Sequence, residues 1–163
     1  MKKILILIPF LVILNTGNSY AQYEFDLNDL DGNSVKLSEL LKKGPVFIQF
    51  WAMWCVSCKE EMKLMNELYA KYKDSGFVYV AMNQDSPKSS AKVKSFILSK
   101  GYDFITLYDP DMSVYERFGG QNLPFSVFMD RNGNIIKTYT GFMSGDESNL
   151  EEDVKKAILS GKN

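Results

Sequence analysis

Two cysteines, Cys55 and Cys58, are the residues of this sequence best placed to do chemistry. They are the only cysteines among 163 residues, and Val56 and Ser57 separate them. An apolar run ends just before Cys55 and a charged helical stretch follows. Cys55 should therefore occupy a first helical turn, where unpaired backbone N–H groups and the positive end of the helix dipole stabilise a thiolate. A thiol three residues later can resolve a mixed disulfide, so the pattern predicts a dithiol–disulfide switch.

The same two residues could instead form a structural disulfide or part of a metal site. A disulfide that closes a four-residue loop stabilises a protein by only about 2 kcal/mol, less than one that closes a longer loop. The chain contains no histidine, which excludes Cys–His nucleophile pairs, Ser-His-Asp triads and every metal site that needs histidine. Two cysteines alone make half of a zinc site, so we expect neither a metal nor a cofactor.

The N-terminal residues have the pattern of a secretory signal peptide. Two lysines precede the apolar run Ile4–Leu14, and the small residues Ser19 and Ala21 lie where a cleavage site requires them. Eleven apolar residues are too few to span the roughly 30 Å hydrocarbon core of a membrane. We therefore expect residues 1–21 to be removed after Ala21, which leaves residues 22–163 as one exported, periplasmic domain.

Composition limits the classes of partner. The chain is 45% hydrophobic and 24% charged, which is ordinary for one globular domain. Without the two N-terminal lysines, 17 basic residues face 20 acidic ones, a net charge of −3. This modest acidity argues against nucleic acid or an anionic membrane as the main partner. In an oxidising compartment, a small domain stabilised by disulfides usually carries several cysteines, so a single pair favours catalysis.

Hydrophobic periodicity predicts strands that alternate with helices. The expected strands are 25–27 and 35–37 as a β-hairpin, then 46–51, 77–82, 104–108, 125–129 and 135–140; the expected helices are a short turn at 38–41, a helix after Cys58 that stops at Gly76, one from Pro87 to Gly101, one from Asp109 to Phe118, and a terminal one over 147–159. This order predicts a mixed central sheet with helices on both faces.

The segment 51–61, WAMWCVSCKEE, which follows the strand at 46–50, resembles the active-site segment of the thioredoxin superfamily. The signal peptide, the hairpin segment 25–40, the extra strand–helix region 77–101 and the Leu-Pro pair before strand 125–129 are similar to the exported TlpA/ResA-like branch. The resemblance covers nearly the whole mature chain. It implies an α/β fold, a thioredoxin-like three-layer sandwich with an N-terminal β-hairpin extension.

The resemblance also implies roles for individual residues. Cys55 matches the exposed attacking thiol and Cys58 the buried resolving thiol. Pro124 matches the proline that is cis in this superfamily and faces the cysteines, although a trans proline at the start of a strand is the alternative. Leu123 would then bind an extended partner peptide, and Trp54 would give an apolar surface for substrate beside the thiol.

The sequence departs from the family pattern at the residues that set redox potential and proton transfer. The dipeptide between the cysteines lacks the usual proline, so the pattern leaves the reduction potential open. Gln49 replaces the buried aspartate of thioredoxin, and a neutral amide cannot act as a base. Asp85, just past strand 77–82, is the best positional match for a carboxylate that takes the proton of Cys58. The alternative is a turn or helix-capping residue before Pro87.

These observations predict an exported thiol-disulfide oxidoreductase that reduces disulfides of other exported proteins through a Cys55/Cys58 cycle. A membrane-bound thiol reductant would regenerate the dithiol, and we expect the protein to act as a monomer. Ala52 stands where a peroxidase of this superfamily has threonine, which argues against peroxide reduction. The alternative function is a peptide-binding or assembly module whose disulfide stays closed.

Overall fold

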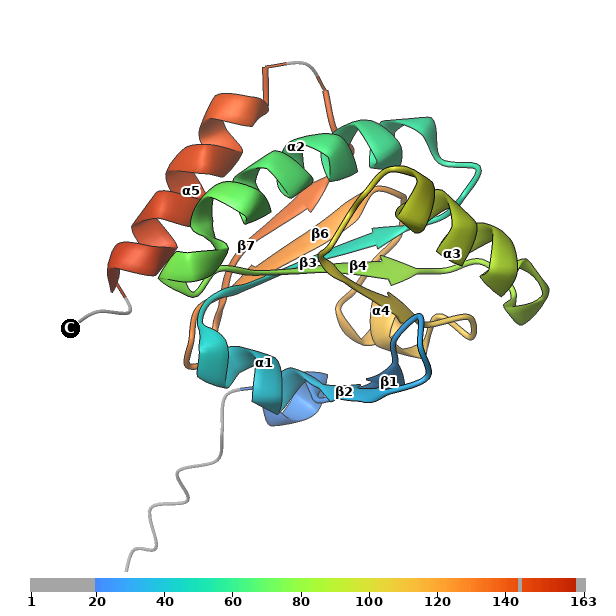
Figure 1. Cartoon of the computed structure of the whole chain (residues 1–163). Coiled ribbons are helices and arrows are strands. Elements are labelled where there is room, and N and C mark those ends of the chain that lie inside the picture. Colours follow the sequence, from blue (N-terminus) through green and yellow to red (C-terminus); the bar gives the residue numbers. More distant parts are fainter. Residues whose placement is uncertain (1–19, 144, 161–163) are drawn as a thin grey trace, which may run out of the picture.

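The computed structural model describes residues 20–143 and 145–160, so residues 1–19 of the expected signal peptide lie outside the described residues. In chain order (Figure 1) the elements are the 3₁₀ helix η1 (Ala21–Tyr23), β1 (Asp26–Asn28), β2 (Ser34–Lys36), α1 (Leu37–Lys43), β3 (Val46–Trp51), α2 (Val56–Tyr72), η2 (Lys73–Ser75), β4 (Val78–Asn83), η3 (Pro87–Ser89), α3 (Ser90–Ser99), β5 (Ile105–Tyr108), α4 (Ser113–Arg117), β6 (Phe125–Met129), β7 (Ile135–Thr140) and α5 (Glu147–Ser160). The bounds of β3, β6 and β7 are those predicted from the sequence.

Five strands form the central sheet in the order β5-β4-β3-β6-β7. β3 runs parallel to β4, and β4 runs parallel to β5. β6 is antiparallel to both β3 and β7. The expected mixed sheet is therefore confirmed. Its central strand is β3, the strand that leads directly into the cysteine pair.

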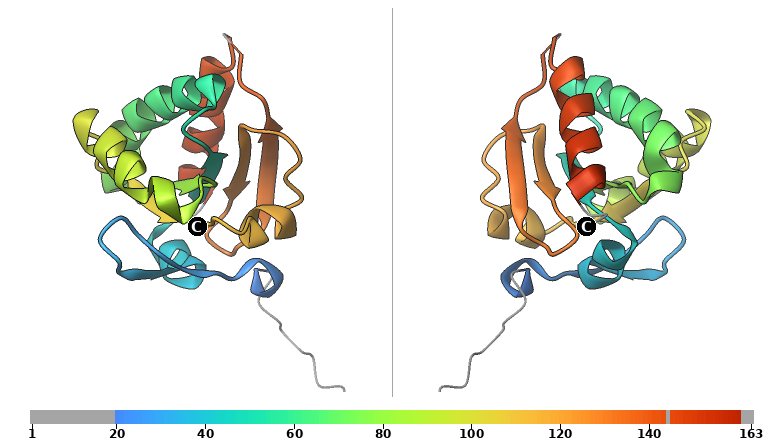
Figure 2. Two further views of the ribbon diagram at one scale, coloured as in Figure 1. Left: turned by 90° about the vertical axis from the view of Figure 1, so that its right-hand side faces the viewer. Right: turned by 90° about the vertical axis from the view of Figure 1, so that its left-hand side faces the viewer.

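Helices cover both faces of the sheet (Figures 1 and 2). Buried side chains of α2, α3 and α5 pack in one cluster with residues such as Phe47 of β3. Side chains of α1 and α4 pack in a second cluster with Ile48, the next residue of the same strand. Alternate residues of a strand point to opposite faces, so a strand buried on both sides must be apolar almost throughout. This is why β3 reads as a nearly continuous hydrophobic run.

The N-terminal hairpin extension is also present. β1 and β2 pair antiparallel, with Leu27 opposite Val35. Asp29 shapes the turn, because its carboxylate accepts hydrogen bonds from the backbone N–H groups of Asp31 and Asn33, at 2.8 and 2.9 Å. Such side-chain-to-backbone bonds are typical of Asx turns. An antiparallel bridge between Asp29 and Leu107 attaches this hairpin to the edge strand β5.

Helix α4 is shorter than the sequence predicts. It begins at Ser113, whereas the pattern indicated a start at Asp109 and Pro110. The Asp109 carboxylate accepts from the backbone N–H groups of Val114 and Tyr115, at 3.1 and 3.0 Å, so it satisfies the first helical donors from outside the helix. The residues between are a turn, closed by the Met112 N–H donating to the Asp109 carbonyl at 3.1 Å.

None of the helices within residues 20–143 and 145–160 is long and apolar enough to cross a lipid bilayer.

Phe47→Ala tests how much the packing around β3 contributes to the free energy of unfolding. Phe47 is fully buried and its ring lies against those of Tyr79, Phe128 and Tyr139. Truncation should lower the free energy of unfolding by about 3–5 kcal/mol, because it removes apolar burial and leaves a cavity. Denaturant unfolding of the oxidised protein measures this change. Ile136→Ala, at a half-exposed position of β7, is the control and should change stability by less than about 1 kcal/mol.

Candidate active site

The two cysteines form a disulfide at the start of α2. Their sulfurs are 2.01 Å apart and their Cα atoms 5.3 Å apart. Cys55 is the N-cap of the helix, and its sulfur accepts a hydrogen bond from the backbone N–H of Cys58 at 3.2 Å. After reduction, this N–H and the helix dipole remain directed at the sulfur of Cys55, so both favour its thiolate form.

The two sulfurs differ in accessibility less than the sequence predicts. Cys58 is completely buried, as expected of a resolving thiol. Cys55, which the resemblance implied to be exposed, is only 5% exposed in the disulfide form. The disulfide turns the Cys55 side chain back against the first helical turn. Its neighbours project instead, with Trp54 73% and Val56 70% exposed. Cys55 is still the more accessible of the two cysteines.

Ser57, between the cysteines, adds a hydroxyl to the site. Its oxygen lies 3.7 Å from the sulfur of Cys55. A hydroxyl rotates freely and can donate to a thiolate, so Ser57 can stabilise the charged form of Cys55. The family proline that this dipeptide lacks could not offer such a donor.

Leu123 and Pro124 lie at the same end of the sheet as the cysteine loop. The peptide bond between them is cis, as the resemblance implied. β6 begins immediately afterwards, with Phe125 opposite Phe50 near the end of β3. Leu123 is partly buried against the core cluster that contains both cysteines. The segment therefore borders the site, and the exposed ring of Trp54 adds an apolar surface to the cysteine loop.

The side chain of Asp85 contacts the backbone of the loop that precedes the cysteines. Its carboxylate accepts from the Met53 N–H at 2.7 Å and from the side-chain amide of Asn83 at 2.8 Å. The Met53 bond holds the loop between β3 and α2 in place, and the Asn83 bond fixes the Asp85 carboxylate against the end of β4. The Asp85 carboxylate thus contacts the residues that precede Cys55, while a second carboxyl group follows Cys58 by one helical turn on α2.

That second group is Glu61, which the sequence pattern did not single out. Glu61 is 1% exposed and accepts hydrogen bonds from Gln49 Nε2 at 2.8 Å and Ser126 Oγ at 2.9 Å. Gln49 Nε2 also donates to the carbonyl oxygen of Cys58, at 2.9 Å. Burial raises the pKa of Glu61 to about 7, although the two donated bonds oppose that rise.

A signal for Glu61 was present in the sequence. It follows Cys58 by three residues, so the two side chains share one helix face. The same face carries Met62, Met65 and Leu68, all buried. The pattern does not by itself predict a buried glutamate here, because charged residues rarely lie in a core without partners. Its partners, Gln49 and Ser126, come from β3 and β6.

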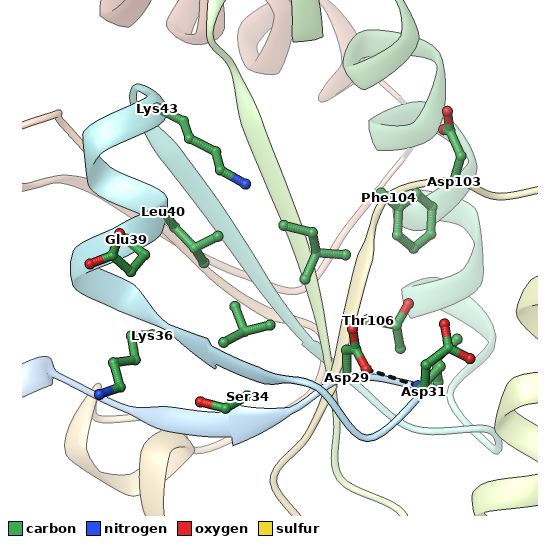
Figure 3. A pocket seen from close by; sticks show the side chains of 13 residues that line it. Asp29, Asp31, Ser34, Lys36, Glu39, Leu40, Lys43, Asp103, Phe104 and Thr106 are labelled. Carbon is green, nitrogen blue, oxygen red and sulfur yellow. Dashed lines mark hydrogen bonds between the residues drawn. The ribbon is translucent and has the colours of Figure 1, made fainter.

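A separate hollow of about 700 Å³ lies between the β1–β2 hairpin, α1 and β5 (Figure 3). Lys36, Lys43 and Glu39 line one side of it, and Asp103 and Phe104 line the other. Its lining includes neither cysteine, nor Glu61. Among the residues that the structure describes, no three His, Cys, Asp or Glu side chains are grouped so that they could hold a metal ion.

Comparisons with known proteins agree with this geometry. A model of the Redoxin family matches residues 16–154. The chain is 36% identical over 128 residues to thiol-disulfide oxidoreductase ResA of Halalkalibacterium halodurans, which covers 78% of this chain and 70% of that protein. It is 34% identical over 132 residues to ResA of Bacillus thuringiensis, covering 81% and 73%. A crystal structure assigned as the thiol:disulfide interchange protein DsbE of Chlorobium tepidum matches with TM-score 0.76 and 32% identity, covering 83% of this chain and 93% of that one.

The buried Glu61 should make stability depend on pH. Its pKa is about 7 in the folded protein against 4.5 ordinarily, so the folded state holds the proton more tightly and stability should fall as pH rises between these values. The total loss is on the order of 3 kcal/mol. Glu61→Gln removes the titrating group, so its stability relative to the parent should increase from pH 5 to pH 8. Denaturant unfolding of both oxidised proteins measures this, and parallel pH profiles would contradict it.

Proposed function

This chain belongs to the Redoxin family and is a thiol-disulfide oxidoreductase, and from that premise we propose that it reduces disulfides of other exported proteins through Cys55 and Cys58. The observation that carries the proposal is the asymmetry of the pair. Cys55 is an N-cap residue with a backbone donor on its sulfur, and Cys58 is fully buried behind it. One thiol can therefore attack a partner while the other is protected from it.

In the first step, the Cys55 thiolate attacks one sulfur of a substrate disulfide. A bond forms between Cys55 Sγ and that sulfur, the substrate S–S bond breaks, and the other substrate sulfur leaves as a thiolate. The Cys58 N–H and the helix dipole stabilise the attacking thiolate. Leu123 and Trp54 offer the apolar contacts for the polypeptide that carries the disulfide, and the backbone of the partly exposed Leu123, next to the cis proline, suits an extended chain.

In the second step, Cys58 loses its proton and attacks Cys55 Sγ. The internal disulfide forms, the mixed disulfide breaks, and the second substrate sulfur leaves as a thiolate. Two electrons have then passed from the protein to its substrate. Glu61 is the group we assign as acceptor of the Cys58 proton, because it shares the helix face of Cys58 and has a pKa of about 7. A base with a pKa near the working pH is both available and strong enough.

A further dithiol must return Cys55 and Cys58 to the reduced state after each cycle. Outside the cytoplasm soluble reducing pools are absent, so we propose a membrane-bound thiol reductant as the second partner. Export itself rests on the N-terminal pattern of two lysines, the apolar run Ile4–Leu14, and the small residues Ser19 and Ala21. We propose that the mature protein begins at Gln22 and acts as a monomer.

A peptide-binding module with a permanently closed disulfide remains the alternative role. It would use the same Leu123–Pro124 edge but no thiol chemistry. The oxidoreductase relatives and a carboxyl group held ready beside the buried cysteine favour a pair that cycles. A module that only binds would gain nothing from the buried Glu61, whose ionised form is costly in a core.

Cys58→Ser should trap substrates. Without the resolving thiol, the mixed disulfide at Cys55 persists, so the variant should form conjugates with exported proteins that dithiothreitol releases. Non-reducing electrophoresis and mass spectrometry of an exported-protein extract detect them, and the parent protein should reduce insulin. Cys55→Ser is the matched control and should trap none, because Cys58 is fully buried. Equal conjugate yields from the two variants, or no turnover of insulin by the parent, would contradict the cycle.

Glu61→Gln and Asp85→Ala should separate the two carboxylates. Glu61→Gln should slow release of the second thiol from a mixed disulfide by about 100-fold at neutral pH, because the proton acceptor is lost. Asp85→Ala should change that rate by less than about threefold, yet lower the free energy of unfolding by about 1–2 kcal/mol, since the Met53 N–H loses its acceptor. Stopped-flow kinetics and denaturant unfolding measure the two effects. The opposite ranking of rates would return the proton-transfer role to Asp85.

A further inference from the structure

Behind Glu61 lie two polar side chains that the steps above do not use. Gln49, in the centre of β3, and Tyr79, on β4, are both fully buried. Gln49 Nε2 donates to Glu61 at 2.8 Å and to the Cys58 carbonyl oxygen at 2.9 Å. The Tyr79 hydroxyl donates to Gln49 Oε1. One amide therefore joins the carboxyl group to the backbone of the resolving cysteine.

We propose that Gln49, oriented by the Tyr79 hydroxyl, is a positioning residue that holds the Glu61 carboxyl group in place to receive the proton of Cys58. The inference rests on the proposed role of Glu61 in the second step. Gln49 itself takes no proton, because an amide is neutral throughout the working pH range. Its role is to keep the Glu61 carboxylate correctly placed relative to the Cys58 thiol.

The hydrogen-bond pattern permits only one orientation of the Gln49 amide. Both groups that Nε2 meets, the ionised Glu61 carboxylate and the Cys58 carbonyl, accept hydrogen bonds and cannot donate. A reversed amide would direct Oε1 at the carboxylate and leave the Tyr79 hydroxyl facing an N–H group. Burial raises the pKa of Tyr79 well above its ordinary value, so its hydroxyl stays protonated and remains a donor.

The same bond sets how readily Glu61 ionises. Gln49 and Ser126 each donate to one oxygen of the carboxylate, and both bonds stabilise the charged form against burial. Loss of the Gln49 donor should therefore raise the pKa of Glu61 above about 7. At neutral pH, less of the carboxylate would then be free to accept a proton, and the second step would slow.

Other titratable groups face Glu61 from several elements. Cys58 lies on the same helix, Tyr79 on β4 and Tyr139 on β7, and Asp146 precedes α5. The negative charge of Asp146 raises the pKa of Glu61, and the pKa of Tyr139 is raised in part by Glu61. Within the described residues, Gln49 and Ser126 donate to the carboxyl group, and Gln49 also donates to the carbonyl oxygen of Cys58.

The proposed proton transfer is balanced within the second step. The Cys58 thiol gives its proton to the Glu61 carboxylate, and the resulting thiolate attacks Cys55 Sγ. The bond from Cys55 to the partner sulfur breaks, and that sulfur leaves with the electron pair. Glu61 later returns its proton to solvent or to Cys58 when the pair is reduced again.

Gln49→Met tests the inference, because methionine matches glutamine in length but neither donates nor accepts strongly. The reduced protein is mixed with dithionitrobenzoate, and each displaced thiolate is followed by its absorbance. The first phase reports attack by Cys55 and the second reports resolution by Cys58. We expect the second phase to slow about tenfold at pH 7 and its pH midpoint to rise by about one unit, with the first phase unchanged.

Three comparisons separate positioning from mere packing. Gln84→Met removes another buried glutamine, whose amide donates to Asp109, and should leave the second phase unchanged. Tyr79→Phe deletes only the hydroxyl and should slow the second phase about threefold. Tyr72, at the C-terminal end of α2, donates its hydroxyl to Glu151 of α5, and Tyr72→Phe should leave the second phase unchanged. In a Glu61→Gln background, Gln49→Met should slow the second phase by less than about twofold further.

Two results would overturn the inference: an unshifted pH midpoint in Gln49→Met, or rate losses from Gln49→Met and Glu61→Gln that multiply in the double variant. If Gln49→Met does not fold, Tyr79→Phe replaces it as the test. An unshifted pH midpoint of the second phase in Tyr79→Phe would also overturn the inference. Failure of the proposed function would look different. The parent protein would then show no second phase, or Glu61→Gln would resolve as fast as the parent.

Discussion

The central strand β3 has a strand on each edge and helices against both faces, so each of its side chains must pack or find a hydrogen-bond partner. Most of them pack. The one polar residue, Gln49, finds three partners: Tyr79, Glu61 and the backbone of Cys58. The constraint that buries the strand therefore also creates the polar centre of the site. Where β3 ends, the chain turns into the cysteine loop, so packing and chemistry share one element.

The polar centre combines a group that is costly to bury with partners that lower that cost. An ionised carboxylate in a core is unfavourable, and burial raises the pKa of Glu61 to about 7. The donors from Gln49 and Ser126 prevent a larger rise. The result is a carboxyl group that exchanges its proton near neutral pH. An aspartate at position 49 would supply charge from the strand, whereas here the helix supplies the charge and the strand supplies the donor.

The two ends of the site are held by different kinds of contact. The Asp85 carboxylate fixes the approach to Cys55 through the Met53 N–H, and Gln49 fixes the rear of Cys58 through its carbonyl oxygen. The cysteine pair thus lies between an outer bond to the loop and an inner bond to the helix. The segment from Met53 to Cys58 is thus hydrogen-bonded at both ends, while the ring of Trp54 between them is exposed.

The sequence by itself determined the layered α/β fold, because strand and helix periodicity is local and each apolar run indicates its own strand or helix. It also determined the reactive pair, since spacing alone places Cys55 at a helix start and Cys58 one turn on. Only the tertiary structure showed that Glu61 is buried and joined through Gln49 to the backbone of Cys58, whereas Asp85 bonds to the loop before Cys55. Glu61 can be buried because Gln49 and Ser126, which lie 12 and 65 residues away in the chain, donate to its carboxylate. These partners come together only when the sheet assembles, so no local sequence pattern predicts their contacts with Glu61.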